Sequence, residues 1–137
     1  MKFEIKPSGT ISNWGSVVHF TAGGNCCGAT DRTPGVWFYP HSLRLHIRQS
    51  RPGSNNDGCD PATSLKKDQW NAVKIRLQGR SFQVWYDNKL VCTNDNYQNK
   101  HGAHDVKLYQ GDPWYPAANA HIRGFKYDAP PTPPPSL

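Results

Sequence analysis

Residues 70–88 read WNAVKIRLQGRSFQVWYDN, and this stretch decides the fold. Apolar side chains occupy every second position on both sides of a glycine: Val73, Ile75, Leu77, then Phe82, Val84 and Tyr86. Period-two alternation around a glycine turn predicts a β-hairpin with one dry face and one wet face. Asp87-Asn88 predicts a second tight turn, and residues 89–92 then return as a third strand. Three strands cannot bury their apolar face alone, so the rest of the chain must supply a covering sheet.

A tryptophan that opens a strand, a hairpin around a glycine and an aromatic-Asp-Asn turn resemble the central hairpin of the concanavalin A-like lectin/glucanase superfamily. This superfamily includes laminin G-like and pentraxin-like modules. The resemblance extends more weakly to residues 9–20, 35–39 and 121–127. It implies an all-β, antiparallel two-sheet jelly-roll sandwich, in a superfamily whose members bind glycans or proteins, build scaffolds or hydrolyse polysaccharides.

The composition favours the same fold class. Twelve Gly, twelve Pro and 12% aromatic residues in 137 describe a chain that is rich in turn formers and poor in helix formers. The length suits one domain, which we expect to span residues 1–128 and to be followed by a Pro-rich tail at 129–137.

About nine strands are expected. Besides the central meander, alternation predicts an edge strand at 2–6 and strands at 14–21, 36–39 and 43–48, near 106–108 and at 121–127. Residues 22–35 and 49–69 are predicted to be loops, the second being the longest irregular stretch. Val18, Phe20, Leu43, Leu45 and Ile47 are expected to point inward.

The formal net charge of +6 would suit an acidic partner such as nucleic acid, a sulfated glycan or an anionic surface. Lysine and arginine alternate along strands, as at Lys74 and Arg76, which is typical of the wet face of a sheet. No nucleic-acid-binding motif accompanies them, so we expect no nucleic-acid partner. No apolar span is present, so no membrane insertion is expected either.

The four cysteines, Cys26, Cys27, Cys59 and Cys92, indicate disulfides in an oxidising compartment, because their spacing does not fit zinc knuckles. If each strand reverses the one before, all four lie at one end of the sandwich. A bridge between the neighbours Cys26 and Cys27 would be strained. We therefore expect one of this pair to bond Cys59 and the other to bond Cys92, each bridge contributing about 3 kcal/mol, with the assignment open.

Catalysis is not expected. Retaining glycoside hydrolysis needs two carboxylates about 5 Å apart, which glucanases of this superfamily supply from one short acidic strand. Glu4 is the only glutamate of this chain, and the aspartates lie in separate predicted loops. No G-x-S-x-G motif is present either.

Loop oxygens could bind calcium, the one cofactor that we consider. Under the same strand count, the candidate ligands fall at the end that carries the cysteines: Asp31, Asp57, Asp60 and Asp112, with Asn55 and Asn56. Ordinary turn chemistry explains these residues equally well. His101 and His104 could bind a transition metal, but a solvated pair is the simpler interpretation.

Aromatic residues are the candidates for glycan binding. Trp114 and Tyr115 in a loop, with Trp85 on a wet strand face, could stack on sugar rings, and Arg32 or Asn119 could donate hydrogen bonds. The alternative is that Asp112-Pro-Trp forms a structural lid. Trp14, Trp37 and Trp70 are expected in the core or its lids.

The tail, residues 129–137, contains five prolines and cannot join a sheet. As polyproline II it would extend for roughly 28 Å. We hypothesise that it docks on a neighbouring subunit through Pro130, Pro131, Pro133, Pro134 and Pro135, which would build a filament or a ring. Hydroxylation or O-glycosylation could modify Thr132, Pro133, Pro134, Pro135 and Ser136. The expected function is thus a non-catalytic extracellular or cell-surface structural module that pairs with itself; the alternatives are a carbohydrate-binding module and, for the tail, a linker to another domain.

Overall fold

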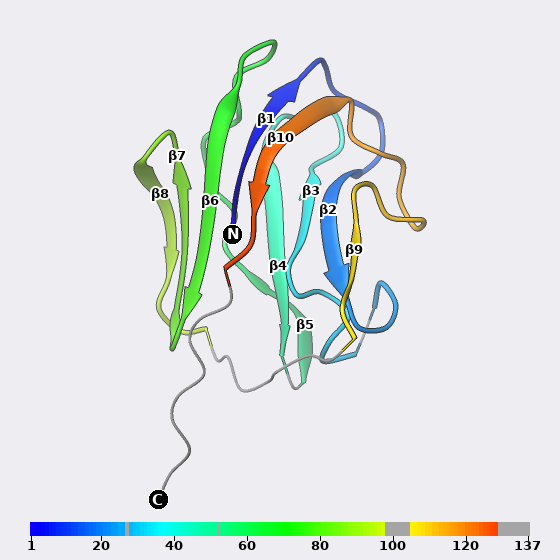
Figure 1. Cartoon of the computed structure of the whole chain (residues 1–137), viewed down its shortest axis with the longest axis vertical. Helices are drawn as coiled ribbons and strands as arrows, with labels where there is room; N and C mark the ends of the chain where they lie inside the picture. Colours follow the sequence, from blue (N-terminus) through cyan, green and yellow to red (C-terminus); the bar gives the residue numbers. More distant parts are fainter. Residues whose placement is uncertain (27, 52, 98–104, 129–137) are drawn as a thin grey trace, which may run out of the picture.

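A computed structural model describes residues 1–26, 28–51, 53–97 and 105–128, apart from the side chain of Asn55. Within these ranges the chain forms ten strands and no helix (Figure 1). The strands are β1 (Lys2–Pro7), β2 (Gly15–Thr21), β3 (Gly35–Phe38), β4 (Leu45–Arg51), β5 (Ser54–Gly58), β6 (Asn71–Gln78), β7 (Ser81–Tyr86), β8 (Lys89–Asn94), β9 (Lys107–Tyr109) and β10 (Ala120–Lys126). The predicted fold class, an all-β antiparallel two-sheet jelly-roll sandwich, is confirmed.

The strands divide into two five-stranded sheets. Sheet A has the order β10-β1-β6-β7-β8, and sheet B has the order β5-β4-β3-β2-β9. Every pairing between neighbouring strands is antiparallel. The prediction that the first strand lies at an edge is wrong, because β1 pairs with β10 on one side and with β6 on the other.

The core lies between the inner faces of the sheets. Alternation places Phe3 and Ile5 of β1 there, and residues of the same kind from the other strands join them: Val18, Val36, Phe38, Leu45, Ile47, Val73, Ile75, Phe82 and Val84. All of these side chains are buried. The period-two pattern therefore predicted the buried positions of Val18, Phe20, Leu45 and Ile47 correctly, while Leu43 is only partly buried.

The predicted loop 49–69 contains a strand that the sequence did not reveal. β5, with the sequence SNNDG, pairs with β4 through a hairpin whose turn contains Gly53, a residue with a φ of 82°. Tertiary pairing rather than propensity creates this strand. An added Cβ on Gly58 would overlap the carbonyl oxygen of Ile47, so the close approach of the two strands requires glycine at this position.

The extra strand reverses every direction counted after it. β2 and β6 point the same way in Figure 1, so the Gly79 turn lies at the end where residues 22–34 lie. If the nine predicted strands had simply alternated in direction, the Gly79 turn and residues 22–34 would lie at opposite ends of the sandwich.

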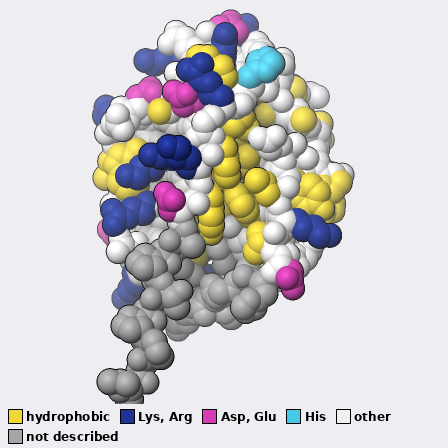
Figure 2. All heavy atoms as spheres, viewed as in Figure 1, with side chains coloured by type: hydrophobic (Ala, Val, Ile, Leu, Met, Phe, Trp, Pro, Cys, Tyr) yellow, Lys and Arg dark blue, Asp and Glu magenta, His cyan; other side chains and the backbone are white. Residues whose placement is uncertain are grey.

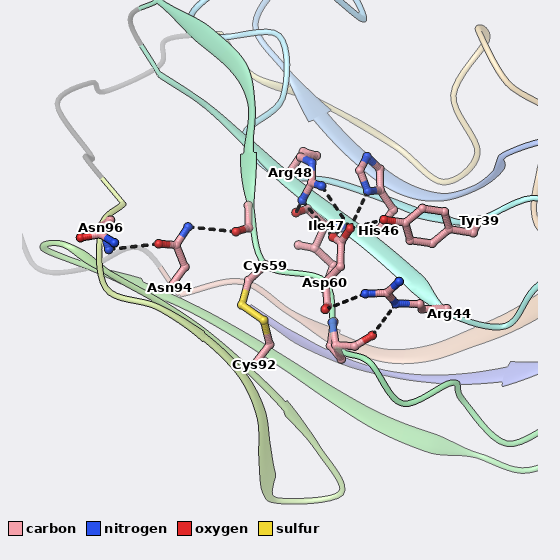
Figure 3. The surroundings of a disulfide bond; sticks show 12 residues. Tyr39, Arg44, His46, Ile47, Arg48, Cys59, Asp60, Cys92, Asn94 and Asn96 are labelled. Atoms are coloured by element: carbon pink, nitrogen blue, oxygen red, sulfur yellow. Dashed lines mark hydrogen bonds and ion pairs between the residues drawn. A yellow bond between two sulfur atoms is a disulfide. The ribbon is translucent and has the colours of Figure 1, made fainter.

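The predicted pairing of the cysteines is also wrong, because Cys59 bonds Cys92, with their Cα atoms 6.0 Å apart (Figure 3). This disulfide joins the end of β5 in sheet B to β8 in sheet A. Beside it, Asn94 Nδ2 donates to the carbonyl of Gly58 at 2.9 Å. Cys26 is disulfide-bonded as well, while Cys27 lies outside the described residues. One side of the sandwich is thus covalently closed.

Candidate functional site

Aromatic rings cover the outer face of sheet B, the side away from the core. Alternation along β3 and β4 sends Val36 and Leu45 inward, and it therefore sends Trp37 and His46 outward. We call the resulting surface the aromatic face and define it by seven residues from β2, β3, β4 and three loops: Trp14, His19, Trp37, Tyr39, His46, Trp114 and Tyr115.

The rings of the aromatic face contact one another in an unbroken series. Trp14 lies with its centroid 4.8 Å from that of His46, and His46 lies 6.0 Å from Trp37. Trp37 contacts His19 at 5.1 Å, and His19 contacts Trp114 at 5.3 Å. Such offset and edge-on contacts hold aromatic rings in fixed orientations. The face is therefore a preorganised surface rather than a set of independent side chains.

Asp60 is the polar centre at one end of the aromatic face (Figure 3). Its Oδ2 accepts hydrogen bonds from His46 Nδ1 at 2.8 Å and from the hydroxyl of Tyr39. Its Oδ1 accepts from the backbone N–H of Ile47 at 2.8 Å, and the guanidinium of Arg48 donates to both oxygens at 2.9 and 3.1 Å. One carboxylate therefore fixes the orientation of three side chains.

These contacts determine the charge states around Asp60. Burial would raise the pKa of Asp60, but the hydrogen bonds from His46, Tyr39 and the amide of Ile47 outweigh it and lower the pKa to about 2. Burial lowers the pKa of His46, against the opposing effect of its hydrogen bond to Asp60. Neutral His46 thus donates from Nδ1, and its Nε2 makes no hydrogen bond to any described residue. That nitrogen can accept a hydrogen bond from a ligand.

Asp112 holds the other end of the aromatic face. Its Oδ2 faces His19 Nδ1 at 2.9 Å and Trp37 Nε1 at 3.3 Å, while its Oδ1 accepts from the backbone amides of Trp114 and Tyr115. Burial would raise the pKa of Asp112, but the bonds from His19 and these two amides lower it overall. Asp112 therefore ties the loop that carries Trp114 to sheet B. Trp114 itself stays 40% exposed.

The structure brings three of the five predicted glycan-binding residues together. Trp114 lies on the aromatic face, Tyr115 contacts Trp37 at 6.2 Å, and the guanidinium of Arg32 lies 4.8 Å from the centre of the Trp37 ring. Trp85 is elsewhere, on the outer face of sheet A beneath Lys74. Asn119 is exposed and lies beside Gly9, outside the aromatic face.

The predicted calcium ligands are occupied by hydrogen-bond donors of the protein. Asp60 and Asp112 are bonded as described, Asp31 accepts from the amides of Gly24 and Gly28, and Asp57 accepts from Arg51. Asn56 accepts from Arg48. Among the described residues no group of three or more His, Cys, Asp or Glu side chains is placed to bind a metal. His101 and His104 lie outside those residues.

Sequence reasoning missed Tyr39 and His46, named Asp60 only as a candidate calcium ligand, and assigned Trp14 and Trp37 to the core or its lids. Trp37 is buried, at 2% exposure, but on the outer face of sheet B. The alternation of Trp37-Phe38-Tyr39 and of Arg44, His46 and Arg48 was the available signal, since it placed these side chains on one face.

No protein-family model and no curated protein matches the chain. Its likeness to the concanavalin A-like superfamily therefore stays a prediction. In the described part of the chain no helix has the length and apolar character needed to cross a membrane. Fold and site together define a disulfide-linked β-sandwich with an aromatic surface on one sheet.

Proposed function

We propose that this protein is a non-catalytic carbohydrate-binding module and that the aromatic face is its glycan-binding surface. The observation that carries the proposal is the fixed series of rings that ends in the exposed indole of Trp114. Flat, preorganised aromatic rings stack on the C–H faces of sugars, and neighbouring polar groups fix orientation. Trp14, Tyr39, His46 and Tyr115 are all partly exposed, and His46 Nε2 can accept a bond from a sugar hydroxyl.

A non-catalytic role is supported by the state of the carboxylates on this surface. Both oxygens of Asp60 and both oxygens of Asp112 accept hydrogen bonds from the protein. A nucleophile or general acid must instead be directed at the substrate. The Cys59–Cys92 disulfide is compatible with a secreted protein, and we propose an extracellular or cell-surface location.

The test compares two tryptophan variants on opposite sheets. W114A should lose glycan-array binding, because it removes the exposed ring of the aromatic face. W85A removes a partly exposed tryptophan from the outer face of sheet A and should bind like the wild type. Thermal unfolding of both variants serves as the control that each variant remains folded. Equal loss of binding in both variants, or retained binding in W114A, would contradict the proposal.

A structural subunit that assembles through its tail is the second candidate, and the open side of the sandwich favours it. Opposite the disulfide, Leu108 of β9 is 45% exposed and Tyr127, just after β10, is 53% exposed. Tyr127 and Phe125 stack on Phe20 of β2 at 5.2 and 5.9 Å. Figure 2 shows hydrophobic side chains in a hollow on this side of the molecule. A groove of about 210 Å³ lined by Ile5, Val17 and Ile122 continues it.

Ser16, Gln110 and His121 also line this groove, while Phe20, Phe125 and Tyr127 lie together beside Leu108. Exposed aromatic side chains of this kind are typical of surfaces on which proline-rich segments dock. In this proposal the residues that dock, Pro130, Pro131, Pro133, Pro134 and Pro135, belong to a neighbouring copy. They lie outside the described residues, as do the modification candidates Thr132 and Ser136. Deletion of residues 129–137 should leave a folded monomer at concentrations at which the full chain self-associates, as measured by sedimentation. The L108K variant should also be a folded monomer at those concentrations. A truncated chain that still polymerises would rule out assembly through the tail.

A further inference from the structure

The outer face of sheet A, on the opposite side of the sandwich from the aromatic face, is strongly basic. The strands β1, β6 and β10 place six cations on it: Lys2, Lys6, Lys74, Arg76, Arg123 and Lys126. Glu4 is the one acidic residue within the five strands of this sheet, and it pairs with Arg123 at 2.7 Å. Figure 2 shows Lys and Arg side chains over the part of the surface formed by β6 and β1.

Three of these lysines stand directly beside one another across three strands. In the strand register Lys126 pairs with Lys2, and Lys2 pairs with Lys74. All three are exposed, and none forms an ion pair with a described residue. We call Lys126, Lys2 and Lys74 the lysine row.

A β-bulge completes the lysine row. Gly124 has a φ of 63° and interrupts the register between β10 and β1, so Arg123 and Lys126 both face outward although three positions separate them. Phe125 is turned inward, where it stacks on Phe3 and Phe20. Strict alternation would have put Lys126 on the core side.

The lysine row does not stabilise the fold. Like charges directly opposite on neighbouring strands repel one another and destabilise the pairing. The lysine row therefore attaches three lysine side chains to the backbone at steps of one strand spacing, about 4.8 Å, on a solvent-exposed surface. An anionic polymer lying across the strands would relieve this repulsion.

Cation–π contacts hold Lys74 of the lysine row and two cations of the same sheet face, Lys6 and Arg123. Lys74 lies 4.8 Å from the centre of the Trp85 ring, and Arg123 lies 3.9 Å from that of Trp70. Lys6 also lies over Trp70, at 6.0 Å. Both tryptophans are therefore occupied by cations. Single-stranded nucleic acids bind by stacking bases on free aromatic rings, which this face does not offer.

We propose that the lysine row binds a polyuronate, a linear polysaccharide that carries a carboxylate on each sugar residue. A polyuronate that lies across the strands carries a carboxylate on every sugar residue, and the flexible side chains of Lys126, Lys2 and Lys74 can reach carboxylates along it. Lysine presents a compact, strongly hydrated charge that needs no bidentate geometry, which suits single carboxylates. The site goes beyond the proposed function, since it lies on the other sheet and recognises charge instead of ring faces.

The test uses polygalacturonate oligomers as the probe and two variants with equal charge change. K2Q/K74Q/K126Q removes the lysine row. K66Q/K67Q/K107Q removes three other exposed lysines and serves as the control. Binding is measured by fluorescence anisotropy at low and physiological ionic strength, with neutral dextran, dextran sulfate and a single-stranded oligonucleotide as further ligands.

We expect the wild type to bind polygalacturonate in a salt-dependent manner and to ignore dextran. The lysine-row variant should bind about tenfold more weakly, as the loss of three exposed charge contacts implies, and the control should change by no more than about twofold. The lysine-row variant should melt no lower than the wild type, because it removes a repulsion. Equal weakening in both variants would reduce the effect to net charge and overturn the proposal. Tighter, row-dependent binding of dextran sulfate or of the oligonucleotide would overturn the choice of polyuronate. Failure here would leave the glycan-array result at Trp114 unaffected.

Discussion

Asp60 shows how one residue can organise a surface. Its donors come from Tyr39 just after β3 and from side chains and the backbone of β4, and Asp60 itself is the residue next to the disulfide-bonded Cys59. The sequence marked Asp60 only as a loop carboxylate and a candidate calcium ligand. Its partners His46 and Tyr39 lie 14 and 21 residues away, so no local pattern could reveal the network.

The lowered pKa of Asp60 predicts a specific acid sensitivity. Because the folded-state pKa of about 2 is below the ordinary 3.8, the stabilisation is complete above about pH 4 and is lost as the pH falls through about 2. The lowering of this pKa from 3.8 to about 2 corresponds to about 2 kcal/mol. D60N should therefore lose about 2 kcal/mol of unfolding free energy at neutral pH, and the gap to the wild type should shrink on acidification. Urea denaturation over a pH series measures both. Parallel curves for the two proteins would show that this carboxylate does not carry the effect.

At the scale of strands and loops, alternation was informative wherever a strand has one buried and one exposed face. It predicted the 70–88 hairpin, the inward residues and the outward position of Trp85. Alternation does not show which of the two sheets an outward-facing side chain belongs to. Trp85 was therefore grouped with Trp114, although the two residues lie on opposite sheets. β5 escaped notice because its polar residues have no alternation, and the bulge at Gly124 because a bulge breaks alternation.

The candidate site was predicted only in part for the same reason. Trp114, Tyr115 and Arg32 were recognised as an aromatic loop with a cation, and they do converge on Trp37. The other half of the aromatic face depends on strand order, which brings Trp14 beside His46. Strand order is a property of the whole sheet, and it is not encoded in the spacing of any one segment.

For the whole molecule, the Cys59–Cys92 disulfide is the main link between the sheets on its side. It connects residues 33 positions apart, and the chain-entropy relation gives a stabilisation of roughly 3–4 kcal/mol. C59S/C92S should lose about this much unfolding free energy in urea titrations. N94A removes the hydrogen bond to Gly58 and the one that Asn94 Oδ1 accepts from the amide of Asn96, and should lose about 1–2 kcal/mol. A double serine variant as stable as the wild type would show that noncovalent packing alone closes this side.

The pairing of β1 with β10 also has a consequence for the order in which the protein can fold. β1 occupies an interior position of sheet A, yet one of its two neighbours is the last strand of the described chain. During synthesis, the edge of β1 that pairs with β10 therefore stays unpaired until residues 120–126 have been made. Such long-range closure slows folding and leaves an apolar strand unpaired in the nascent chain. The strand β1 is thus a part of sheet A that can be completed only after the other strands of this sheet have been made.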